Sequence, residues 1–216
     1  MRLRPGESDA LDRRIAAVEA RTGVQVVVAL VPRSDSYLEL PWKACALGTS
    51  LAALGLVVAD IWPGRPITSG SPLLPALVIL GAGAVCALLS IFAAPFARLF
   101  LRETHSHAAV KAYAEALFLK RELFATRDRT AVLLLVSQFE RRVEIFADSG
   151  LHGRVGEADW QRVIETMRPY LRDADPGGAL EAGIGAVEAV LVSKGFHGRA
   201  GMANELPDRP IEERGR

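Results

Sequence analysis

The sequence predicts an α/β domain, a three-layer sandwich around a small mixed sheet, interrupted by a two-helix transmembrane hairpin. A helix and a strand precede two long uncharged segments, and a helix, two strands and two more helices follow them. The chain has 216 residues, 50% of them hydrophobic, which leaves room for one small domain and a pair of membrane spans.

The first part of the domain is predicted within residues 8–35. Apolar side chains recur there at helical spacing: Leu11, Ile15 and Val18. Gly23 suits the C-terminal cap of that helix. Nearly every residue of the segment 24–31 is apolar, which is typical of a strand covered on both faces, and Pro32 ends it.

Two uncharged segments predict a transmembrane hairpin within residues 42–98. Residues 44–59 and 73–97 are each close to the roughly 20 residues that a helix needs to cross about 30 Å of hydrocarbon. Trp42 and Trp62 flank the first segment, where aromatic rings favour the headgroup level. Both cysteines, Cys45 and Cys86, lie inside these segments and are interpreted as small hydrophobic residues.

The charges flanking the hairpin predict its orientation. Basic residues stand before the first span and after the second: Arg33, Lys43, Arg98, Arg102 and Lys111. The connection 63–72 carries only Arg65 as a positive charge. We therefore expect a multi-pass protein of the bacterial inner (cytoplasmic) membrane with both termini cytoplasmic. Asp60, beside Trp62, is interpreted as an interfacial acid rather than a proton relay.

The second part of the domain is predicted within residues 103–195. Residues 107–128 carry one apolar stripe and predict a helix of about six turns. The strands 131–136 and 142–145 follow with a short break, which predicts an antiparallel hairpin. A helical crossover joins the first strand of the chain to residues 131–136, so these two strands should be parallel.

Two helices are expected to complete the domain. They are predicted at residues 157–173 and 178–195, and Pro169 should kink or divide the first of them. Residues 196–216 are rich in glycine, proline and charge and are predicted to be disordered.

This order of strands gives the domain two distinct ends. Residues 137–142 should lie near the bilayer and Asp148 at the far end. Arg141 and Arg142 then either contact anionic headgroups, worth on the order of 1 kcal/mol for each residue, or remain solvated in a turn.

The strands and the last helices also resemble a known family. The segments ARTGVQVVVALV, TAVLLLVSQFERRVEIFADSGL and DWQRVIETMRPYLRDADPGGALEAGIGAVEAVL resemble the TPM domain, the family of the thylakoid-lumen and photosystem II repair phosphatase-like proteins. Within it, the chain is most similar to bacterial membrane-bound members with an inserted span pair. The resemblance implies acid phosphatase activity and binding of calcium or a similar divalent cation. His152 replaces the family's usual acid after the Gly-Leu turn, which removes an oxygen ligand of the kind calcium needs.

Four acids are candidate metal ligands at the far end of the domain: Asp128, Asp148, Glu157 and Asp159. A hard cation takes roughly six to eight oxygens, of which these residues could supply some. The alternative is that these acids have local structural roles. Asp148 precedes a turn, and Glu157 and Asp159 stand in a first helical turn, where negative charge is favoured. His105 and His107 do not share a helix face, and no general acid or base stands out.

The function expected from these features is a membrane-anchored, non-catalytic accessory or scaffold protein. Its partners would be the lipid bilayer and an unidentified cytoplasmic protein, which meets the acidic far end. The alternative is a divalent-cation-dependent phosphatase with its metal at Asp148. A small transport subunit would need a polar stripe along the spans, which they lack. The formal net charge of +1, with both signs interspersed, excludes nucleic acid as an expected partner.

Overall fold

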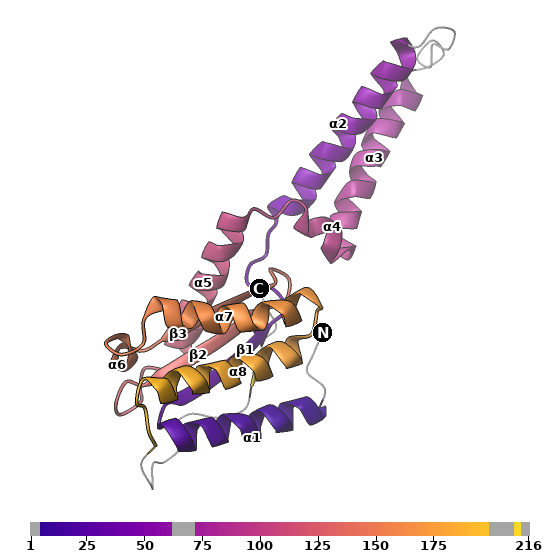
Figure 1. Cartoon of the computed structure of the whole chain (residues 1–216). Helices are drawn as coiled ribbons and strands as arrows, with labels where there is room; N and C mark the ends of the chain where they lie inside the picture. Colours follow the sequence, from indigo (N-terminus) through magenta and orange to yellow (C-terminus); the bar gives the residue numbers. More distant parts are fainter. Residues whose placement is uncertain (1–4, 62–71, 199–209, 213–216) are drawn as a thin grey trace. The chain divides into compact units, whose positions relative to one another are not determined.

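The computed structural model describes residues 5–61, 72–198 and 210–212 (Figure 1). The chain divides into two compact units. Residues 1–35 with 106–216 form one, called the domain unit below, and residues 36–105 form the other, called the hairpin unit. Each unit is described by itself.

The domain unit alternates helices and strands. In chain order its elements are α1 (Pro5–Thr22), β1 (Gln25–Val31), most of α5 (Glu103–Lys120), β2 (Ala131–Ser137), β3 (Arg142–Ala147), α6 (Ser149–His152), α7 (Glu157–Arg172), α8 (Pro176–Ser193) and β4 (Ile211–Glu212).

The sheet has the strand order β3-β2-β1-β4. β1 and β2 are parallel along all seven residues of each strand, from Gln25 opposite Ala131 to Val31 opposite Ser137. β2 and β3 form an antiparallel hairpin. The predicted small mixed sheet and both strand pairings are therefore confirmed, and the two-residue β4 adds a further parallel strand beside β1.

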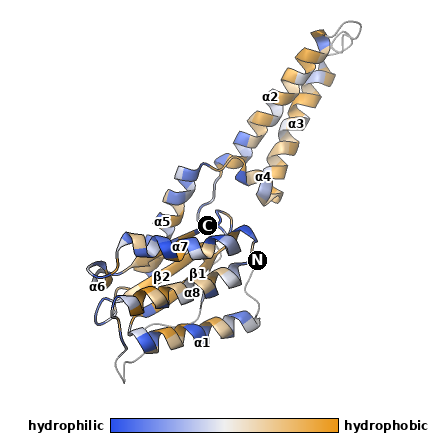
Figure 2. Ribbon diagram, viewed as in Figure 1, coloured by the Kyte–Doolittle hydropathy of each residue, from blue (hydrophilic) through white to orange (hydrophobic). Residues whose placement is uncertain are grey.

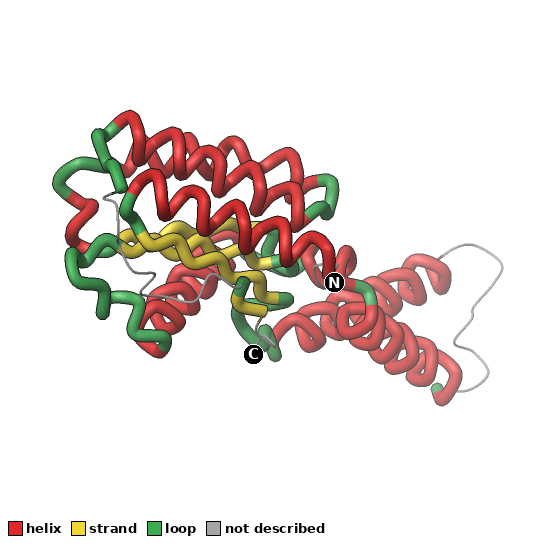
Figure 3. The backbone as a smooth tube through the Cα atoms, turned by 90° about the horizontal axis from the view of Figure 1, so that it is seen from below, coloured by secondary structure: helices red, strands yellow, loops and turns green. Residues whose placement is uncertain are grey.

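Helices cover both faces of this sheet, as Figure 1 and Figure 3 show. Even-numbered residues of β1, such as Val28, pack with α1, α7 and α8, where Ile15, Met167 and Ile184 are fully buried. Odd-numbered residues, such as Ala29, pack with α5. Because side chains alternate along a strand, the apolar residues 26–31 of β1 can supply two cores at once. The three-layer sandwich is confirmed.

The helix after the hairpin unit ends earlier than predicted. α5 stops at Lys120 instead of continuing to residue 128. Glu122 takes a left-handed conformation with φ 51°, the Leu123 N–H donates to the Phe118 carbonyl at 3.0 Å, and the Glu122 N–H donates to the Leu119 carbonyl at 3.1 Å. This is the Schellman arrangement, which usually places glycine where Glu122 stands. The sequence therefore gave no sign of the helix end.

Pro169, which was predicted to kink or divide its helix, does not divide it. α7 continues through Pro169 to Arg172, so the missing proline N–H costs one hydrogen bond in the last turns without interrupting the helix. The helix ends when Ala174 turns left-handed with φ 57°, and the Asp175 N–H bonds to the Tyr170 carbonyl at 2.9 Å.

The predicted disorder from residue 196 onward does not hold at the residues that the structure describes. Phe196 is buried in the core, and the Arg154 guanidinium lies 4.0 Å from its ring centroid. The Gly198 N–H donates to the Arg21 carbonyl at 2.7 Å, and Ile211 pairs with β1. Residues 199–209 and 213–216 lie outside the described part.

The hairpin unit contains α2 (Glu39–Ile61), α3 (Leu73–Phe92) and the short α4 (Ala94–Arg98). α2 and α3 are long and apolar enough to cross a membrane, and Figure 2 shows that hydrophobic residues predominate along both ribbons. The second predicted span is shorter than expected, because Ala93 is extended and Pro95 lies in the first turn of α4. Trp62 and most of the predicted connection lie outside the described residues.

The two long helices are in close contact at glycine. A Cβ atom on Gly48 would lie 2.7 Å from the Ala82 carbonyl oxygen, and one on Gly83 would lie 2.5 Å from the Thr49 methyl group. Small residues at these positions let the two backbones approach.

Candidate functional site

The four predicted metal ligands belong to segments at one end of the domain unit, called the acidic end below. Asp128 precedes β2, Asp148 follows β3, and Glu157 and Asp159 lie in the first turn of α7. The Asp148 N–H donates to the carbonyl of Ala131, the first residue of β2, at 2.9 Å. The acidic end is therefore where β1 and β2 begin and β3 ends.

Asp148 is buried and caps the short helix α6. Its Oδ1 accepts hydrogen bonds from the Ser149 N–H at 2.7 Å and from the Ser149 hydroxyl at 3.3 Å. Its Oδ2 lies 3.2 Å from Nε of Arg129, and only 5% of the side chain is exposed. Asp148 thus combines the local backbone bonding expected of an acid before a turn with an ion pair to the half-exposed Arg129.

The backbone around this ion pair is tightly packed. Arg129 takes a left-handed conformation with φ 54°, and its carbonyl accepts the Gly150 N–H at 3.0 Å. A Cβ on Gly150 would lie 2.5 Å from the Asp128 carbonyl oxygen. Glycine is therefore required at position 150 so that this turn can approach the segment before β2.

Asp159 is a second buried carboxylate at the acidic end, and its basic partners are partly exposed. Its Oδ2 accepts the Gly156 N–H at 3.0 Å and lies 2.7 Å from Nζ of Lys194, while Oδ1 pairs with Arg162. The hydrogen bond from Lys194, followed by that from the Gly156 N–H, holds the pKa of Asp159 below its ordinary value. Asp159 is therefore ionised and neutralised by the chain's own basic residues.

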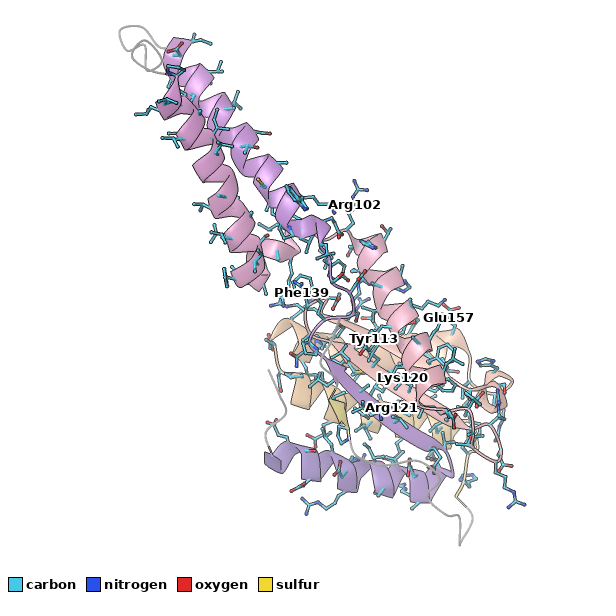
Figure 4. The ribbon with its side chains drawn as sticks, turned by 180° about the vertical axis from the view of Figure 1, so that it is seen from behind. Arg102, Tyr113, Lys120, Arg121, Phe139 and Glu157 are labelled. Carbon is cyan, nitrogen blue, oxygen red and sulfur yellow. The ribbon has the colours of Figure 1, made fainter. Side chains whose placement is uncertain are left out.

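The other two predicted ligands are exposed. Asp128 and Glu157 both face solvent, and Figure 4 labels Glu157. Across the described residues, no group of three or more histidine, cysteine, aspartate or glutamate side chains could hold a metal ion. The four acids share one end of the domain without forming a common ligand set. His152 has Nε2 3.0 Å from the Ala147 carbonyl.

Sequence reasoning missed the basic partners of these acids. Arg129 and Lys194 belong to other segments than their acids and lie beside Asp148 and Asp159 only after folding. Arg162 was recognisable in principle, since it stands three residues after Asp159 on one helix.

A buried polar cluster lies at the opposite end of the sheet, after β1 and β2. The Ser34 hydroxyl donates to the Ser137 hydroxyl at 2.9 Å, and the Ser137 hydroxyl donates to Glu140. Glu140 also accepts the Ser34 N–H at 2.9 Å. All three residues are buried, so this carboxylate links the segment after β1 to the β2–β3 turn.

Arginine side chains surround that turn. The Arg33 guanidinium lies 4.1 Å from the ring centroid of Phe139, which Figure 4 labels. Arg142 donates from Nε to the Ser106 hydroxyl at 3.0 Å, so this arginine is bound within the domain unit. Arg141 is exposed, and its contact with lipid headgroups stays a prediction.

Comparison with known proteins agrees with the fold and the sequence pattern. Residues 96–190 match the family model of the TPM domain. The chain contains a TPM domain. The match begins within α4 and leaves out β1, although the structure shows that β1 pairs with β2. The resemblance seen in the sequence is therefore confirmed.

Two solved structures share the fold of this TPM-domain chain. One is the BA42 protein from the psychrophilic bacterium Bizionia argentinensis, with a TM-score of 0.60, 14% identity, and coverage of 99% of this chain and 97% of that one. The other is the N-terminal domain of a protein from P. gingivalis, with a TM-score of 0.51, 14% identity, and coverage of 93% and 83%. Identity at this level shows the fold alone. No curated protein matches the sequence.

Proposed function

We infer that this TPM-domain chain is a non-catalytic accessory or scaffold protein anchored in the cytoplasmic membrane. The observation that carries this proposal is the state of the two buried acids of the acidic end, Asp148 and Asp159. Asp148 is paired with Arg129, and Asp159 with Lys194 and Arg162. A divalent cation at either carboxylate would have to displace a positive group that the fold already supplies.

The membrane anchor rests on the hairpin unit. Large apolar side chains stay exposed along both long helices, including Leu54 at 60%, Leu77 at 70% and Ile91 at 59%. Lipid is the environment in which such surfaces are stable. The basic flanks of the hairpin favour cytoplasmic termini, which leaves the TPM domain in the cytoplasm.

The protein partner would meet the TPM domain at its acidic end. Asp128 and Glu157 are exposed there and supply negative charge that is open to a basic surface. A photo-crosslinking amino acid at position 157, in the full chain within native membranes, should capture a specific protein. The same probe at Glu181, which is exposed on α8, is the matched control. Recovery of the chain alone from both positions would contradict the scaffold proposal.

The second candidate is a divalent-cation-dependent phosphatase, and one observation favours it. Oδ2 of Asp148 is buried and accepts no hydrogen bond, although Arg129 lies beside it. Phosphate-ester hydrolysis by the full chain should be measured with and without calcium or magnesium. Turnover that depends on the cation and is lost in Asp148→Asn supports this alternative, whereas turnover that is absent in the parent removes it.

A further inference from the structure

We propose that the outer edge of β1 is a docking site for an extended, aliphatic segment of a partner protein, and that the chain's own Ile211–Glu212 occupies it in the unbound state. The proposal rests on the scaffold function and deepens it by naming a backbone surface for the partner. The proposed edge site does not involve the residues of the acidic end.

The hydrogen-bonding pattern of β1 identifies which groups face this edge. The Gln25 N–H donates to the Thr130 carbonyl at 3.0 Å, so residue 25 faces β2. Because backbone groups alternate along a strand, Val27, Ala29 and Val31 face β2 as well. The N–H and C=O groups of Val26, Val28 and Leu30 therefore face away from β2, toward the outer edge.

Two different parts of the chain contact the outward-facing backbone groups of β1. At one end, the Val26 N–H donates to Oε1 of Glu19 at 2.7 Å, so a side chain takes the place of a strand. Further along, Ile211 stands opposite Ala29, which puts it between the outward groups of Val28 and Leu30. Among the described residues, β4 is the only strand on this side, and it pairs with two of the seven residues of β1.

The edge also supplies an apolar contact for its occupant. Ile211 is partly buried and packs against the core cluster that contains Val27, Ala29 and Leu133. An extended segment gains affinity from main-chain hydrogen bonds and specificity from alternate side chains. The site therefore favours a segment parallel to β1 with an aliphatic residue in the position of Ile211.

β4 has the features of a displaceable occupant. Two paired residues give it few hydrogen bonds, and Pro210 cannot donate to a strand ladder on the N-terminal side. β1 has seven buried residues, and an edge of that length and hydrophobicity readily pairs with another strand when it is uncovered. The bound tail covers the edge until a competing segment arrives.

The test uses the full chain in detergent micelles and a fluorescent peptide of residues 207–214, sequence PDRPIEER. Ile211→Asp should release the chain's own tail, so that this variant binds the peptide at least about tenfold more tightly than the parent, whose tethered tail competes. The Leu30 amide should exchange faster in the variant, while the Val132 amide is unchanged. Val192→Asp, at an exposed position of α8, is the matched control and should behave like the parent.

Several results would overturn the proposal: equal peptide binding by parent and Ile211→Asp, no binding by the variant at about 1 mM peptide, or equal binding of a peptide that carries aspartate at the Ile211 position. Photo-crosslinking in membranes separates this failure from that of the scaffold function. A partner captured equally by parent and Ile211→Asp would contradict the edge site alone.

Discussion

Glu140 shows how one residue can join segments that are distant in the sequence. Its carboxylate accepts from Ser137 and from the Ser34 N–H, and all of these groups are buried. Glu140→Ala would leave both donors unsatisfied, and we expect a loss of about 1–3 kcal/mol in the free energy of unfolding. Denaturant unfolding of the full chain measures this loss. Glu181→Ala, at an exposed position with the same change, should cost less than about 0.5 kcal/mol.

Glu144 gives the domain a dependence on pH. Burial on β3 is the largest cause that raises its pKa above the ordinary 4.5; Glu115 also raises it, while His107, Lys111 and Arg142 lower it. Stability from this residue is present below pH 4.5 and is lost as pH rises through the folded-state pKa, because the folded domain binds the proton more tightly than the unfolded chain.

Glu144→Gln removes that titration. The free energy of unfolding of this variant, relative to the parent, should therefore rise as pH increases above 4.5 and then level off. Urea unfolding at a series of pH values measures the difference. A difference that falls over the same range would contradict the assignment.

Among the features of the secondary-structure elements, the sequence predicted the ends of the helices least well. Pattern reasoning found every long helix of the domain, because the apolar stripes reflect burial, but it extended α5 beyond Lys120. Glu122 and Ala174 occupy left-handed positions after α5 and α7 that glycine usually takes. Local composition cannot reveal such an end when tertiary packing, here of the buried Leu123, imposes it.

Glu122→Gly should therefore stabilise the domain. Glycine has no Cβ penalty at positive φ, so we expect a gain of roughly 1 kcal/mol in the free energy of unfolding. The control is Glu181→Gly, inside α8, which should lose about 1 kcal/mol. A loss in both variants, measured by thermal unfolding, would show that residue 122 is not left-handed in solution.

The contact between α2 and α3 depends on Gly48 and Gly83. The sequence alone does not distinguish these two glycines from the other small residues of the uncharged segments. Gly48→Leu should separate the helices, because a Cβ there already meets the Ala82 carbonyl oxygen at 2.7 Å. Gly55→Leu, on the same helix with nothing within 4 Å of the added Cβ, is the control. Unfolding of the hairpin in mixed detergent micelles should require less denaturing detergent for Gly48→Leu only.

For the whole molecule, the sequence predicted the architecture better than the site. The nearly continuous apolar runs of β1 and β2, together with a helical crossover, were enough to predict a parallel pair inside a sandwich, and the structure confirms it. The sequence also grouped Asp128, Asp148, Glu157 and Asp159 at one end. It could not show that Arg129 and Lys194, from other segments, reach two of them, because ion pairs between distant residues leave no periodic signal.

Internal neutralisation of Asp148 and Asp159 is what distinguishes a scaffold from a metal-dependent enzyme in this account. A calorimetric titration of the full chain with calcium, in detergent micelles at physiological salt, tests this neutralisation. We expect no saturable binding up to about 1 mM, a range in which even the weak calcium sites of extracellular modules begin to fill. Saturable binding well below that concentration, lost in Asp148→Asn and retained in Glu181→Gln, would contradict the account.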